Sequence, residues 1–195
     1  MTRAASDAVT GADGRLRCPW GASTPDYQAY HDDEWGRPVR DDRGLYERLT
    51  LEAFQSGLSW LTILRKREAF RSAFAGFDPA AVAAFGDDDR ERLLADAAIV
   101  RNRAKVDAAI TNARAILDLD ESLTDRLWSF APEGRRRRPQ RLGEVPAKTP
   151  ESTAMAKDLK RRGFAFVGPT TAYALMQATG MVDDHLVDCW VDPDI

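Results

Sequence analysis

The sequence predicts an all-α fold, and three observations support this prediction. From residue 41 onward, apolar side chains recur at the three- and four-residue spacing of helices that bury one face. Capping residues or prolines precede most of these segments, as they do at helix starts. No segment shows the clear alternation of apolar and polar residues that is typical of a half-buried strand.

The composition is that of a soluble globular protein. The chain has 195 residues, 44% of them hydrophobic and 30% charged, and this length allows one domain with a sizeable core. No apolar run is long enough for a membrane span, and the first residues lack the apolar region of a signal peptide. We therefore expect a cytoplasmic protein with no membrane association, in which residues 1–16 form a disordered tail and residues 17–195 form one domain.

The helices can be placed in chain order. We expect them over residues 42–56, 59–74, 79–85, 87–94, 101–118, 123–130, 151–162 and 169–180. Asp42 and Ser59 are suited to capping the first two helices, and Gly163 and Gly180 end the last two. Residues 131–150 are rich in Arg, Pro and Gly, so this stretch is predicted to be irregular, either as a mobile loop or as a binding loop.

The helix over residues 42–56 carries a carboxylate on its apolar face. Leu45 and Leu49 lie one turn apart, and Glu52 follows them on the same face. An ionised carboxylate buried there is costly unless a cation or a hydrogen-bond donor meets it. A salt bridge to a distant arginine is the ordinary explanation, and a binding pocket is the alternative.

The residues that follow Glu52 favour the pocket. Gly57 ends the helix, Leu58 lies at an exposed elbow, and Ser59 caps a helix whose first turn carries Trp60. A carboxylate, a flexible joint, an apolar wedge and a large aromatic side chain thus occur within nine residues. This arrangement is typical of a pocket with a rim, although plain core packing remains open for Trp60.

Two cysteines and two histidines form the candidate metal site. Cys18 and His31 lie near one end of the chain, and His185 and Cys189 lie near the other with the i, i+4 spacing of one helical turn. Four such ligands match a closed tetrahedral zinc site, which would join the two chain ends. The alternatives are a Cys18–Cys189 disulfide, incidental core histidines and a catalytic zinc. A structural zinc ion (Zn2+) is favoured because four protein ligands leave no position for water.

Basic residues are clustered although the net charge is −3. Residues 93–105 join a short helix to a long one through a turn that contains Arg101, Arg103 and Lys105, and such a turn can bind phosphate. Further basic clusters occur at residues 65–71, 135–141 and 160–162. A solvated helix face explains any single cluster equally well.

Several long motifs together resemble a known family. They are residues 17–20 (RCPW), 27–36 (YQAYHDDEWG), 49–60 (LTLEAFQSGLSW), 162–171 (RGFAFVGPTT), 176–178 (MQA) and 184–185 (DH). In these motifs the chain is similar to the Tag-type 3-methyladenine DNA glycosylase I family, from about residue 17 to residue 189. The resemblance implies a helix–hairpin–helix DNA glycosylase fold, helical in two lobes around a base pocket, with a zinc clamp joining the N- and C-terminal segments.

The resemblance also implies roles for individual residues. Glu52 matches the acid of the lesion pocket, and Trp60 and Tyr30 match its aromatic residues, with Tyr27 and Trp35 close by. Gly57 and Leu58 match the residues that fill the gap left by the flipped nucleotide. The zinc ligands of the family match Cys18, His31, His185 and Cys189. Two features depart from the family pattern. Alanines occupy positions 98 and 104, where the family hairpin often has glycine, and the arginine-rich run at residues 135–141 is not part of the pattern.

The activity implied is monofunctional excision of 3-methyladenine from alkylated double-stranded DNA, which leaves an abasic site. We expect a monomeric bacterial enzyme that associates with the nucleoid when it acts. The first alternative is a non-catalytic, zinc-stapled helix–hairpin–helix DNA-binding protein. The second is a zinc hydrolase, which would need an exchangeable water on the metal.

Overall fold

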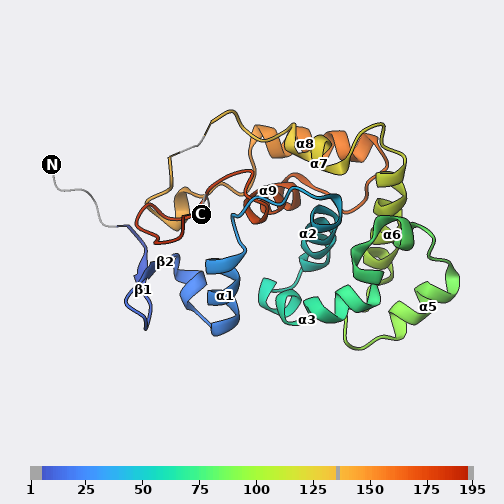
Figure 1. Ribbon diagram of the computed structural model, residues 1–195, viewed down its shortest axis with the longest axis horizontal. Coiled ribbons are helices and arrows are strands. Elements are labelled where there is room, and N and C mark those ends of the chain that lie inside the picture. Colours follow the sequence, from blue (N-terminus) through green and yellow to red (C-terminus); the bar gives the residue numbers. More distant parts are fainter. Residues whose placement is uncertain (1–5, 135–136, 193–195) are drawn as a thin grey trace.

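The computed structural model describes residues 6–134 and 137–192, and most of these residues lie in helices (Figure 1). The α-helices are α1 (Pro25–Asp33), α2 (Asp42–Gln55), α3 (Trp60–Ala73), α4 (Pro79–Ala83), α5 (Asp87–Ala95), α6 (Arg103–Leu117), α7 (Leu123–Trp128), α8 (Pro150–Arg161) and α9 (Pro169–Ala178). Three short 3₁₀ helices accompany them: η1 (Pro19–Ala22), η2 (Ala75–Phe77) and η3 (Leu142–Glu144). The predicted helical class is therefore confirmed.

Helix α2 lies at the centre of the molecule. It contacts α3, α6, α7 and α9, and Figure 1 shows α2 and α9 between α7 and α8 on one side and α3 on the other. Leu45 and Leu49 are fully buried, as the helical spacing predicts, and Phe54 on the opposite face of the helix is fully buried as well. Because α2 is surrounded on most sides, its last turn is held firmly where it reaches the functional site.

The predicted helix segments are found, and their ends differ by a few residues. The cap of α2 is Asp41, whose Oδ1 accepts a hydrogen bond from Gly44 N at 2.8 Å, so the prediction of Asp42 as the cap is wrong. Asp42 instead helps to cap α7, whose N-cap residue is Ser122: its carboxylate accepts hydrogen bonds from the backbone N–H groups of Leu123 and Thr124 at 3.1 and 2.8 Å. A sequence pattern shows that a residue can cap a helix, whereas tertiary packing decides which helix it caps.

The N-terminal segment is more ordered than the sequence suggests. Strands β1 (Val9–Thr10) and β2 (Leu16–Arg17) pair antiparallel, so the expectation of a disordered tail over residues 1–16 is wrong for this hairpin, while residues 1–5 lie outside the described residues. Arg17 explains the order. Its side chain is buried and donates to the carboxylates of Asp13 and Asp32 at 2.6–3.0 Å.

Helix α1 was not predicted as a helix, although its start has a recognisable signal. Thr24 caps it through a hydrogen bond from Tyr27 N to Oγ1, and Pro25 occupies its first position. In the segment after α9, by contrast, helical geometry was predicted where the structure has no helix. His185 lies in a bend and Cys189 directly follows a turn at residues 187–188, so the helical explanation of their spacing is wrong.

The two ends of the described chain lie together. Trp190 N donates to Leu16 O at 2.9 Å, and Figure 1 shows the red C-terminal segment beside the blue N-terminal hairpin. Over residues 6–134 and 137–192, every helix is too short or too polar to span a bilayer.

We predict that Asp42→Ala destabilises the fold by about 1–3 kcal/mol, because three donors of α7 lose their acceptor, including Thr124 Oγ1 at 2.6 Å. Urea unfolding followed by circular dichroism measures this loss. Asp120→Ala is the control, because Asp120 is exposed and has no recorded hydrogen bond among the described residues. Equal stability of the two variants would contradict the assignment.

Candidate active site

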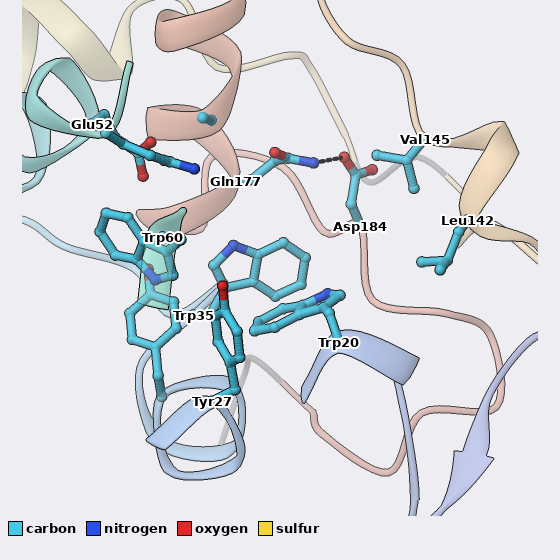
Figure 2. Close-up of a pocket in the computed structure, with 12 residues that line it drawn as sticks. Trp20, Tyr27, Trp35, Glu52, Trp60, Leu142, Val145, Gln177 and Asp184 are labelled. Carbon is cyan, nitrogen blue, oxygen red and sulfur yellow. Dashed lines mark hydrogen bonds between the residues drawn. The ribbon is translucent and has the colours of Figure 1, made fainter. Parts of the chain in front are cut away.

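A cavity of about 460 Å³ opens where α1, α2, α3 and α9 approach one another (Figure 2). Its walls are formed by Trp20, Tyr27, Tyr30, Trp35, Glu52, Gln55, Trp60, Leu142, Val145, Ala174, Gln177 and Asp184. The residues that were predicted to bind the base therefore line one pocket; they are Glu52, Trp60, Tyr30, Tyr27 and Trp35. The volume suffices for a purine base, which is far smaller than most drug-sized ligands.

Glu52 is the buried acid of this pocket. It lies in the last turn of α2, and only 7% of its surface is exposed. Burial raises the pKa of its carboxyl to about 8, and the charge of Arg48, one helical turn earlier, opposes this rise only in part. Glu52 therefore favours its protonated form at neutral pH in the free protein, whereas an adjacent cation would favour its ionised form.

Arg48 is held by a carboxylate other than Glu52. Its guanidinium donates to Glu34 Oε2 at 2.7 Å, and Arg67 donates to both oxygens of Glu34 at 2.6 and 2.7 Å. Burial works against ionisation of Glu34, but these two arginines lower its pKa to about 2. The ordinary explanation for a buried Glu, a close salt bridge, thus applies to Glu34 and not to Glu52.

Aromatic rings line the side of the pocket opposite Glu52 (Figure 2). The ring of Trp60 lies 5.4 Å from that of Tyr30, and the ring of Trp20 lies 5.0 Å from that of Trp35. Trp60 is placed by the helix start, because Ser59 Oγ accepts a hydrogen bond from Thr62 N. These faces present π electrons to whatever occupies the cavity.

The hydroxyl of Tyr27 has a structural partner. It accepts a hydrogen bond from Leu61 N at 3.1 Å, in the first turn of α3, while the ring lines the pocket. Because this bond joins α1 to α3, Tyr27 helps to fix the distance between the helices that carry Tyr30 and Trp60.

Sequence reasoning did not assign the polar far wall. Gln177 Nε2 and Tyr173 Oη both donate to Asp184 Oδ2, at 2.8 and 2.6 Å, and Gln177 and Asp184 face the cavity (Figure 2). Trp20 was likewise given no role. All three lining residues lie within the motifs quoted above, which was the signal available. Leu142 and Val145 come from the irregular stretch, which therefore contributes part of the pocket wall.

The four predicted metal ligands meet in one buried cluster. Ligand atoms of Cys18, His31, His185 and Cys189 all lie within 4.8 Å of one another. Cys189 Sγ lies 3.5 Å from His31 Nε2 and 3.6 Å from His185 Nδ1, and Cys18 Sγ lies 4.0 Å from His185 Nδ1. Both cysteines are free thiols, so the disulfide alternative is not adopted.

The neighbours of this cluster suit a bound cation. His31 Nδ1 contacts Asp32 Oδ1 at 2.8 Å and His185 Nε2 contacts Trp35 O at 3.2 Å, which leaves one nitrogen of each ring for the centre. Metal bonds of about 2.0–2.3 Å in a tetrahedron imply ligand separations of about 3.3–3.8 Å, close to those observed. The donor set and its spacing therefore fit a metal ion.

The predicted duplex-opening residues lie beside the pocket. Gly57 has φ of 79°, a conformation that glycine adopts without strain, and it directly follows Ser56, the C-cap residue of α2. Leu58 is 42% exposed, and its N–H donates to Gln55 O at 2.7 Å. The exposed side chain is thus presented to solvent on a short, anchored loop.

The basic hairpin residues fall into two groups. Arg101 and Arg103 are exposed and have no recorded ion pair among the described residues, so they are available to a phosphate. Lys105 differs, because it is buried and its Nζ donates to Phe54 O and Ser56 O at 2.8 and 2.6 Å. The prediction that Lys105 contacts DNA directly is therefore corrected: its donors are directed into the protein.

Most other basic clusters are neutralised within the fold. Arg65, Arg67 and Arg71 pair with Asp26, Glu34 and Glu47, and Arg161 and Arg162 pair with Asp158. In the arginine-rich run, Arg135 and Arg136 lie outside the described residues. Arg138 donates to Asp183 Oδ2 at 2.7 Å and to Val191 O at 2.8 Å, so it anchors the C-terminal segment.

Comparisons with known proteins agree with this geometry. A family model described as methyladenine glycosylase matches residues 20–192. The chain is 47% identical to DNA-3-methyladenine glycosylase 1 of Escherichia coli K12, over 91% of this chain and 97% of that protein. It is 44% identical to DNA-3-methyladenine glycosylase of Haemophilus influenzae, over 89% and 96%.

A solved structure shares the fold. The Staphylococcus aureus 3-methyladenine DNA glycosylase I, solved to explain its recognition of 3-methyladenine, superposes with a TM-score of 0.84 at 36% identity, over 89% of this chain and 95% of that one. The family model covers nearly the whole described chain. The resemblance noted in the sequence is therefore confirmed, and the chain belongs to the methyladenine glycosylase family.

Proposed function

We propose that this protein is a DNA repair glycosylase that excises 3-methyladenine from alkylated double-stranded DNA. The observation that carries the proposal is the presence, in one cavity, of an aromatic wall and of a buried Glu52 that forms no salt bridge within the described part of the chain. Relatives of this chain are named for that activity. The reaction is hydrolysis of the N-glycosidic bond, and its products are the free base and an abasic site.

Charge provides the selectivity. Methylation at N3 makes the adenine of a nucleotide cationic, and a cation is attracted both to a carboxylate and to aromatic faces. Glu52 then releases its proton to solvent, and its carboxylate accepts hydrogen bonds from the amino edge of the base. Trp60 and Tyr30 stack on the base, each contributing roughly 1–3 kcal/mol as in single-strand stacking sites. Neutral adenine gains less from both contacts.

The lesion itself lowers the barrier to cleavage. When the bond between C1′ and the base breaks, its electron pair moves onto the cationic ring, which leaves as neutral 3-methyladenine. Water adds to C1′ and releases a proton to solvent. This scheme uses no lysine, no covalent intermediate and no dedicated aspartate, so the main task of the protein is to extrude and orient the base.

We assign extrusion to Leu58 and the phosphate grip to the hairpin between α5 and α6. An apolar wedge in the base stack offsets part of the few kcal/mol that flipping costs. The first turn of α6 and the exposed Arg101 and Arg103 suit a backbone phosphate. Neither Ala98 nor Ala104 has a positive φ, so both departures from glycine are compatible with a helix–hairpin–helix element.

We assign the Cys/His cluster to a structural zinc ion. Cys18, His31, His185 and Cys189 would supply all four bonds, which leaves no open position for water. The bound ion would clamp the N-terminal segment to the C-terminal one. It would not take part in bond cleavage.

We predict that Glu52→Gln lowers the single-turnover rate of 3-methyladenine release from methylated DNA by about 10²–10³-fold, because the cationic base loses its counter-charge. Chromatographic identification of the released base measures this rate. Glu91→Gln, at an exposed position, should retain full activity. Full activity of Glu52→Gln would remove Glu52 from this role, and tight DNA binding without base release by the unaltered protein would favour the non-catalytic alternative.

We also predict a pH-dependent cost of Glu52. Because its pKa rises from 4.5 to about 8 on folding, the folded state holds more protons, and the free energy of unfolding falls as the pH rises through this interval. At about 1.4 kcal/mol per pKa unit, the loss reaches several kcal/mol.

Urea unfolding across this pH range measures the effect. Glu52→Gln should lose this decline and be the more stable protein at the upper end, whereas Glu91→Gln should behave like the unaltered chain. If the free energy of unfolding depended on pH in the same way in all three proteins, burial would not raise the pKa of Glu52 as described.

For the metal site, we predict about one zinc ion per chain by elemental analysis and a large loss of zinc in Cys189→Ser. A chelator should lower the melting temperature of the unaltered protein. Replacement of zinc by cobalt should leave the rate of base release unchanged, because the ion is structural. A rate that follows the identity of the metal would instead indicate a catalytic ion.

A further inference from the structure

Lys105 is a buried cation whose recorded partners are backbone carbonyls. It is the third residue of α6, it is 7% exposed, and its Nζ donates to Phe54 O at 2.8 Å and Ser56 O at 2.6 Å. These carbonyls belong to the C-terminal end of α2, where helical partners are lacking and the helix dipole is negative. Leu58 follows two residues later.

A second lysine makes the reciprocal connection. Lys66 of α3 donates from Nζ to Ala97 O at 3.2 Å and Ala98 O at 2.9 Å, within the turn between α5 and α6. One lysine thus reaches from the hairpin to the loop at residues 56–59, and the other reaches from the helix after that loop back to the hairpin. The two lysines tie both elements together in two places.

The chemistry of Lys105 argues against simple packing. A buried ammonium normally has a carboxylate partner, yet no ion pair of Lys105 is recorded within residues 6–134 and 137–192. Burial also lowers the pKa of Lys105. An apolar side chain could fill the same space without this desolvation cost, but it could not bind two carbonyls at the end of α2.

We propose that Lys105 is a positioning residue that sets the distance between the phosphate-binding hairpin and the duplex-opening Leu58. When the hairpin binds the DNA backbone, the link through Lys105 directs Leu58 into the base stack. This inference rests on the proposed function, because it assigns Lys105 a part in the same base-flipping step.

The test compares Lys105→Met with Arg101→Met and Leu58→Ala. The probe is a duplex with a tetrahydrofuran abasic analogue next to 2-aminopurine, whose fluorescence rises when a wedge unstacks it. For Lys105→Met we expect a loss of the fluorescence rise, as in Leu58→Ala, and a fall of about 10–100-fold in single-turnover base release. The salt dependence of its duplex binding should not change, whereas Arg101→Met should reduce the slope by about one.

A merely structural role would give a different pattern. Binding of free 3-methyladenine, followed by quenching of the pocket tryptophans, should be unchanged in Lys105→Met, since the pocket itself is intact. The proposal would be overturned if Lys105→Met lost base binding, thermal stability and the 2-aminopurine fluorescence rise together. It would also be overturned if neither the fluorescence rise nor the rate of base release changed. A salt slope reduced by one would show that Lys105 is a direct phosphate contact, which also overturns it.

Failure of the proposed function can be distinguished from failure of the positioning role of Lys105. If the unaltered protein releases no base, the glycosylase assignment fails. The fluorescence comparison still decides whether Lys105 positions Leu58, because the abasic analogue requires no excision. If the unaltered protein releases the base and Lys105→Met does so equally well, only the positioning role is overturned.

Discussion

The contact between the two ends of the folded chain is the constraint on which the pocket depends. Cys18 and His31 meet His185 and Cys189 within 4.8 Å, and the aromatic wall rests directly on this cluster. The ring of Trp35 lies 4.7 Å from that of His185. Because residues from both ends line the cavity, the pocket exists only while the ends stay together. The metal ion proposed for this cluster would be an efficient clamp, since it would bind all four ligands at once.

The buried carboxylate of Glu52 at the end of α2 is the second main feature of the pocket. Burial at the end of α2 raises the pKa of Glu52 and makes its charge costly in the free protein. In the function proposed above, this loss of stability is exchanged for selectivity toward a cationic base, as is common at functional sites. Central packing of α2 against four other helices supplies the rigidity that tolerates this cost. Glu52 and the loop that bears Leu58 occupy successive positions along one anchored element.

Local sequence patterns were sufficient to predict the fold class, the family and several residues of the site. Apolar spacing predicted the helical class and placed Glu52 on a buried face, and the long motifs identified the family, which the comparisons confirm. The count of two cysteines and two histidines pointed to one cluster, which the fold assembles. These properties are encoded by neighbours within a few residues, or by residue types that are rare in the chain.

Only the tertiary structure decided which distant groups meet. The sequence placed Lys105 with Arg101 in a basic turn, but packing of α6 against the end of α2 turns the lysine inward and leaves the arginine exposed. Asp42 caps a helix far along the chain, and Gln177 faces the cavity beside Asp184. Helical periodicity determines which face of a segment is buried, whereas the partner on that face depends on how the helices assemble. A charged residue near a helix end has several feasible partners, and the fold selects one of them.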